Sequence, residues 1–248
     1  MTALLRAEAR KALTTRSALV VAGLAAVYPA LALLPAVLAP EPPDVDAASL
    51  LDLLRGGADV LAIAALLLGI LAVAGEYRHG TIVPTLLATP RRPRLMAAKV
   101  GFQAAMAAVL AVVAGGVGVA AGGAYLSSRG VSFGGAAGDV ALTAGAVVAV
   151  AALYATLGAA LAGVVRNQTA AVTGALLWVF AAENALPLLL RNPGLDRWMP
   201  GGAADRLLAV ADGAAGSGDA LAGLGLLAGV AAVLAVAAVA SLSSTDIS

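Results

Sequence analysis

Long apolar stretches separated by short polar segments run through the whole chain. Six of them are long enough, as helices, to cross the roughly 30 Å hydrocarbon core of a bilayer. They lie at residues 17–39, 58–74, 100–126, 140–165, 169–190 and 219–242, and the second, which is short, is expected to start a little earlier. Backbone polar groups find no water in lipid and must be satisfied within the segment, so each stretch is expected to be an α-helix. The pattern predicts an all-α polytopic membrane protein with six transmembrane helices.

The composition strengthens this prediction, because 61% of the residues are hydrophobic and only 12% are charged. The absence of cysteine excludes disulfides, thiolate nucleophiles and Cys-ligated metals. The single histidine, His79, gives no basis for a His-rich metal site. No Gly-x-x-x-x-Gly-Lys-Ser/Thr phosphate loop occurs, so the chain is not expected to hydrolyse ATP by that route. We therefore expect no catalytic residue, cofactor or metal in this chain.

The charges between the apolar stretches are unevenly distributed. With both termini placed in the cytoplasm, the inner segments hold ten Lys or Arg and three acidic residues, and the outer side holds five basic and eleven acidic ones. Cytoplasmic segments carry an excess of Lys and Arg, so we expect both termini to be cytoplasmic, in a bacterial inner membrane. The basic residues follow this topology, so no nucleic-acid partner is expected. The short inner connection at residues 165–169 is expected to be a plain topogenic turn.

Residues 1–16 precede the first apolar stretch and form a separate element, ahead of a transmembrane domain at 17–248. Arg6, Arg10 and Lys11 lie on one helical face, and a second face is apolar. The pattern predicts a weakly amphipathic helix at the inner interface, with its cations near anionic headgroups. A basic flank that only fixes topology explains the same residues, and the two interpretations are compatible.

The segment at residues 75–99 is polar, basic and interrupted by proline, and it joins two apolar helices. A loop that only fixed topology would need positive charges alone. It would not need Glu76, the pair Gly80-Thr81 and the pair Leu86-Leu87 in this order. We therefore expect the segment to contact a soluble partner protein.

The order of residues in this segment resembles the membrane subunit of ABC-2-type ABC transporters, whose architecture is that of type V exporters. The matching residues are Glu76, Gly80, Thr81, Leu86, Leu87, Thr89, Pro90, Arg94 and Lys99. The similarity covers the six-span layout, but its specific motif is confined to this segment. The chain departs from the family at Val83-Pro84, where relatives often carry a charged residue, and this puts the detailed docking contacts in doubt.

The resemblance implies a coupling helix that docks into a groove on a separate ABC ATPase subunit, which binds ATP and Mg. The chain would form a dimer, a homodimer in preference to a heterodimer, with two ATPase copies, and would export lipids, antibiotics or peptides. We assign the coupling contacts to Glu76, Arg78, Gly80, Thr81, Leu86, Leu87, Pro90, Arg94 and Lys99. Glu76 and the arginines would make charged contacts at the rim, and the two leucines would supply a desolvated anchor.

Glu183 and Asn184 lie within the fifth apolar stretch. An ionisable residue at membrane depth is expensive, so this pair is a candidate for the substrate pathway. Glu183 alternatively lies near the outer interface and pairs with Arg191. The outer segment at residues 191–218 is expected to begin near the interface at Trp198 and to contain either a short interfacial helix at 203–211 or a simple loop.

Two functions from different classes fit these observations. The first is the permease subunit of an ATP-driven exporter of a hydrophobic or amphipathic substrate. The second is an ATPase-independent membrane transporter, or a non-transporting sensor or immunity membrane protein. A secondary transporter is expected to carry polar sites in two related halves, and Glu183-Asn184 has no counterpart in the first half. The first function is therefore preferred.

Overall fold

The computed structural model describes residues 2–39, 47–88, 91–131, 137–212 and 216–243, and their regular secondary structure is entirely helical. The α-helices are α1 (Thr2–Thr14), α2 (Arg16–Ala32), α3 (Leu34–Leu38), α4 (Ala47–Arg78), α5 (Ile82–Ala88), α6 (Arg92–Ser128), α7 (Ala137–Val165), α8 (Gln168–Leu177), α9 (Glu183–Leu189), α10 (Pro200–Leu208) and α11 (Ser217–Ser243). A π-helix, η1 (Trp178–Ala182), joins α8 to α9. The 3-10 helices are η2 (Pro193–Trp198) and η3 (Ala209–Asp212).

Within the described residues, six helical segments are long and apolar enough to cross a membrane. They are Arg16–Leu38, Leu51–Arg78, Arg92–Ser128, Ala137–Val165, Gln168–Leu189 and Ser217–Leu242. The first consists of α2 and α3, and the fifth consists of α8, η1 and α9. The prediction of an all-α chain with six such helices is confirmed, and by length and composition the chain is a multi-pass membrane protein.

Two of the predicted boundaries are wrong by several residues. The second span was expected at 58–74 with a start a little earlier, and α4 indeed starts earlier but by much more, at Ala47, and continues to Arg78. The third was expected at 100–126, but α6 begins at Arg92, with Pro93 in its first turn. Proline is favoured in the first turn of a helix, where its missing N–H has no partner to lose. The segment at 75–99 is therefore mostly helical, and the connection outside the helices is short.

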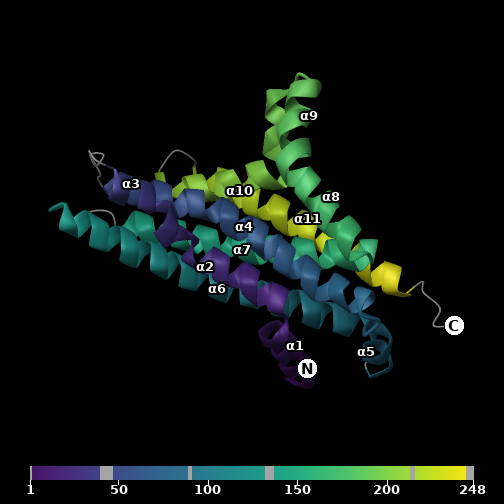
Figure 1. Cartoon of the computed structure of the whole chain (residues 1–248). Coiled ribbons are helices and arrows are strands. Elements are labelled where there is room, and N and C mark those ends of the chain that lie inside the picture. Colours follow the sequence, from purple (N-terminus) through teal and green to yellow (C-terminus); the bar gives the residue numbers. More distant parts are fainter. Residues whose placement is uncertain (1, 40–46, 89–90, 132–136, 213–215, 244–248) are drawn as a thin grey trace.

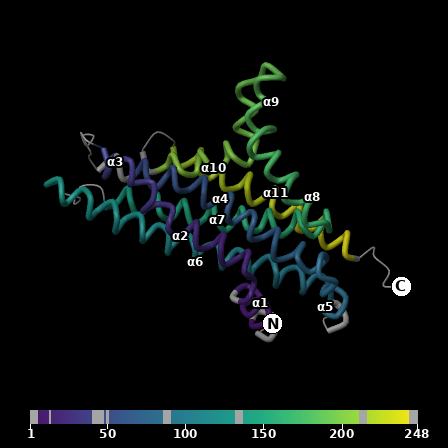
Figure 2. The backbone as a smooth tube through the Cα atoms, viewed as in Figure 1, coloured from purple at the N-terminus to yellow at the C-terminus, as the bar shows by residue number. Residues whose placement is uncertain are grey.

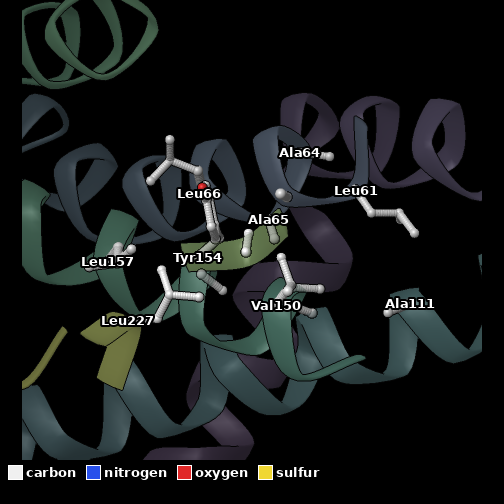
Figure 3. Packing of buried hydrophobic residues seen from close by; sticks show 14 of the residues in the cluster. Leu61, Ala64, Ala65, Leu66, Ala111, Val150, Tyr154, Leu157 and Leu227 are labelled. Atoms are coloured by element: carbon white, nitrogen blue, oxygen red, sulfur yellow. The ribbon is translucent and has the colours of Figure 1, made fainter. Parts of the chain in front are cut away.

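The core of the bundle lies between α4 and α7, with α6 and α11 beside them. Figure 3 shows its packing through Leu61, Ala65 and Leu66 of α4, Val150, Tyr154 and Leu157 of α7, Ala111 of α6, and Leu227 of α11. Many of the buried side chains are alanines, so the helices approach closely, as they do in membranes where small residues face one another.

Glycine allows the closest approach, at the crossing of α4 and α7. A Cβ added at Gly158 of α7 would overlap the carbonyl oxygen of Leu66, and one at Gly69 of α4 would overlap the carbonyl oxygen of Ala155. Each helix thus presents a glycine to the backbone of the other. The two glycines fix the spacing of the two most buried helices.

The fifth span leaves the bundle. In Figures 1 and 2, α8 starts beside the other helices, and η1 and α9 continue away from them. The chain returns through η2, and α10 then packs along α11 and buries Ala203 and Leu208. The region expected at 191–218 therefore contains a helix that contacts the bundle and is not a simple loop.

Two of the remaining short helices, α1 and α5, lie near one end of the molecule, which we call the α5 end. Figure 1 shows α1, α5 and the last turns of α11 near this end of the long helices, whereas α3 lies at the other. Helix α1 packs against α2 and α6. The α5 end is thus built from segments far apart in the sequence.

Candidate functional site

Four charged side chains from three helices meet at the α5 end. They are Glu8 and Lys11 of α1, Glu76 of α4 and Lys99 of α6, and we call them the ionic cluster. The Lys99 ammonium donates to Oε1 of Glu8 at 2.9 Å and to Oε1 of Glu76. The Lys11 ammonium donates to Oε1 of Glu76 at 2.5 Å and to Oε1 of Glu8 at 3.3 Å. Two carboxylates and two ammonium groups therefore balance in charge.

Most of the ionic cluster is shielded from solvent. Glu8, Glu76 and Lys99 are 3%, 4% and 2% exposed, whereas 42% of the Lys11 side chain is accessible. Burying a charge is costly unless an opposite charge and hydrogen bonds compensate it, and here each buried group has an opposite partner. Partial burial lowers the pKa of Lys11, but the hydrogen bond and charge of Glu76, with those of Glu8, outweigh it and raise that pKa above its ordinary value. The cluster therefore joins α1, α4 and α6 firmly.

The backbone of Glu76 also forms the turn that leads into α5. The Thr81 N–H donates to the Glu76 carbonyl at 2.9 Å, and the Gly80 N–H donates to the Tyr77 carbonyl at 3.3 Å. Gly80 has φ of +66°, a conformation that glycine adopts without steric cost. These bonds and this φ define a Schellman motif, a common way for a helix to end. Glu76 thus holds the ionic cluster through its side chain and the root of α5 through its carbonyl.

The structure separates the predicted coupling residues into two groups. Arg78, Gly80, Thr81 and Arg94 are exposed around α5 and can meet a partner. Leu86 and Leu87 belong to the backbone of α5, but their side chains lie outside the described residues, as does the whole of Pro90.

Glu76 and Lys99 form the second group, and both are buried. The expectation that Glu76 makes a charged contact at the rim of a docking surface is therefore corrected. Its carboxylate faces Lys11 and Lys99 within the fold. With Glu76 exposed, Glu8 would be the one carboxylate of the ionic cluster left to balance both ammonium groups. Both residues position the exposed group and do not belong to it.

Glu8 is the member of the ionic cluster that the sequence did not single out. It is the one acidic residue in the first 16 positions, three residues before Lys11. A lone acidic residue in a basic amphipathic helix is the available signal. Only the convergence of α1 with α4 and α6 gives it a role.

Two arginines hold the end of α11 at the same end of the molecule. Arg92 donates to the carbonyl of Leu242, and Arg166 donates to the carbonyl of Ser241 and, at 2.6 Å, to its hydroxyl. The last carbonyls of a helix have no partner within the helix and carry partial negative charge, so guanidinium groups suit them. Arg166 reaches this position with φ of +56°, in the left-handed region. The connection at 165–169 is therefore more than the topogenic turn that was expected.

The second candidate site, Glu183 and Asn184, lies at the junction of η1 and α9. Oε1 of Glu183 accepts from the Trp178 indole N–H at 2.8 Å, and Oε2 accepts from the Gly201 N–H at 3.1 Å. Asn184 donates to the Phe180 carbonyl, in the π-helix η1, at 3.2 Å. Among the described ion pairs none joins Glu183 to Arg191, so the alternative pairing is not formed in this structure.

No protein-family model matches the chain, and no curated protein matches it. The function is therefore inferred from the residues and their geometry.

Proposed function

We propose that the chain is the membrane-spanning subunit of an ATP-driven transporter of the ABC-2 type. It exports a hydrophobic or amphipathic molecule and takes its energy from a separate ATPase subunit that binds ATP and Mg. In the working complex two copies of the chain, in a homodimer, meet two copies of the ATPase. The ATPase docks at the α5 end from the cytoplasm.

The observation that carries the proposal is the double role of Glu76. Helix α5 is short, and its root is fixed by the Glu76 carbonyl, while the Glu76 side chain is held by Lys11 of α1 and Lys99 of α6. A displacement of α5 by a partner therefore acts on three helices of the bundle together. Coupling of this kind requires a rigid connection that moves as one body, and the ionic cluster provides one.

The exposed charges at this end indicate the character of the partner. Arg78, Arg91 and Arg94 are exposed on either side of α5, and the acidic Glu76 is turned inward. A basic surface steers and orients an acidic one. We expect the groove of the ATPase subunit that receives α5 to be rimmed by Asp and Glu.

Purification of the tagged chain from its native membranes tests the proposal. We expect a protein with a Gly-x-x-x-x-Gly-Lys-Ser/Thr loop to co-purify, with Mg-dependent ATPase activity. The double variant Arg78→Glu with Arg94→Glu should lose this partner, because the rim charges are reversed. Arg129→Glu is the matched control, since Arg129 is an exposed arginine at the opposite end of α6. Retention of the partner by the double variant, or its loss in the control, would contradict docking at α5.

A further inference from the structure

An apolar groove lies along the fifth span, away from the ionic cluster. It has a volume of about 560 Å³ and lies between α8 and α11, over α7. Leucine and valine side chains line most of its length, among them Leu157, Leu161, Val230 and Leu234. Among the described residues that line it, Glu183 is the one with a charged side chain. We call this cavity the α8 groove.

The charge of Glu183 has no counter-charge in the described part of the chain. Its hydrogen-bond donors are the Trp178 indole and the Gly201 amide at the start of α10, which are both neutral. Asp205, on the same short helix as Gly201, adds negative potential at this place. A carboxylate beside an apolar groove is costly in the absence of a cation, and a ligand with a positive charge removes that cost.

Aromatic side chains lie at the same end of the groove. The chain has two tryptophans, Trp178 and Trp198, and both line the groove together with Glu183. The face of an indole attracts a cation, by about 0.5–2 kcal/mol depending on solvent exposure. A neutral acyl chain would fill the apolar part of the groove and gain nothing from the carboxylate or from the indole faces.

We propose that the α8 groove binds a small lipophilic cation, with its apolar body against α7, α8 and α11 and its positive charge beside Glu183 and the two tryptophans. The further inference that this cation is the exported substrate rests on the proposed function. Binding itself needs no ATPase subunit, so it can be measured on the chain alone. If the chain did not bind the cation, the proposal that an ATPase docks at α5 would stand. If no ATPase docked at α5, the proposed cation site in the α8 groove would stand.

Intrinsic fluorescence tests the proposal directly, because its tryptophan signal arises only within this groove. The purified full chain in phosphatidylcholine vesicles, which add no tryptophan of their own, is titrated with tetraphenylphosphonium and, separately, with tetraphenylborate, ions of the same shape and opposite charge. We expect saturable quenching by the phosphonium and none that saturates with the borate. Equal behaviour of the two ions would overturn the proposal and leave the groove to lipid chains.

Variants locate the binding charge. Glu183→Gln keeps a hydrogen-bond acceptor and should weaken phosphonium binding about tenfold, the change that corresponds to about 1.4 kcal/mol. Glu183→Asp keeps the charge and should restore most of the affinity. Asp196→Asn is the control, because Asp196 is an exposed acid of η2 that does not line the groove. Unchanged binding in Glu183→Gln, or an equal loss in Asp196→Asn, would contradict the proposal. The comparison of the two ions uses the unmodified chain, so its result does not depend on whether a variant folds.

Discussion

Glu76 accepts a hydrogen bond from Lys99 across 23 positions of sequence, between the last turns of α4 and the first turns of α6. This pair closes the intervening chain, which includes α5, into one loop. Lys11 and Glu8 extend the pair to α1, so the amphipathic N-terminal helix is anchored through charges as well as through any interfacial contact. The exposed residues of the α5 end are held in place by three buried groups, Glu8, Glu76 and Lys99, and by the partly accessible Lys11.

Single substitutions in the ionic cluster should be strongly destabilising. Lys99→Met leaves Glu8 and Glu76 buried with one partly exposed lysine between them, and we expect a loss of about 3 kcal/mol. Glu76→Gln should cost a similar amount because it leaves an excess positive charge. The double variant keeps the Glu8–Lys11 pair balanced, so its loss should be smaller than the sum. Unfolding of the four proteins in detergent completes the double-mutant cycle, and strict additivity would show that the two residues are not coupled.

Replacement of Gly158 by alanine should open the core of the bundle. The new methyl group would overlap the carbonyl oxygen of Leu66, and backbone cannot move aside as a side chain does. We expect a loss of about 1–3 kcal/mol, the usual effect of overpacking. Gly145→Ala, in the same helix, meets nothing within 4 Å and should be neutral or stabilising. Thermal unfolding of both variants measures the difference, and equal stabilities would contradict the close crossing of α4 and α7.

Gly80→Ala should weaken the root of α5 without touching the core. Gly80 has φ of +66° and open space around it, so the cost is conformational, about 1–2 kcal/mol for a residue with a side chain. Gly75→Ala also meets open space and lies within the regular part of α4, so it serves as the control. Hydrogen exchange of the amides of α5 should be faster in Gly80→Ala alone. Equal protection in the two variants would argue against the Schellman turn.

Loss of the Arg166 guanidinium should free the end of α11. Arg166→Ala removes two bonds to Ser241, whereas Arg92 still contacts the neighbouring carbonyl of Leu242. Faster amide exchange is expected in the last turn of α11 and no change at its start near Ser217. A uniform change along the whole of α11 would point to a general loss of packing instead.

The hydrophobic pattern was sufficient to locate all six spans, because a run of apolar residues long enough to cross a bilayer has few other uses. It failed where a helix continues beyond the apolar run. Asp52 and Arg55 interrupt the pattern before the predicted second span, yet α4 persists there because Leu51 and Leu54 are buried against the end of α6 and the start of α7. Tertiary contacts of this kind leave only a faint trace in the sequence.

The sequence indicated where the candidate site lies but not how its side chains are arranged, because that arrangement also depends on tertiary contacts. The order of Glu76, Gly80 and Thr81 pointed to the α5 end, and each of these residues has a definite role in the turn. The sequence placed the Glu76 side chain at the surface, because the pairing of residues from α1, α4 and α6 depends on how the helices converge. Periodicity along one helix does not report that convergence.

The central claim is that an ATPase subunit sits on α5, and a single cross-linking measurement tests it most directly. The chain has no cysteine, so Val83→Cys in α5 creates a unique attachment point for a photoactivatable cross-linker, and Ser128→Cys at the far end of α6 is the control; both positions are exposed. In native membranes the label at residue 83 should capture a protein with an ATP-binding phosphate loop, and the label at residue 128 should not. A label at residue 83 that captures no such protein, while the chain remains folded and active, would contradict the account.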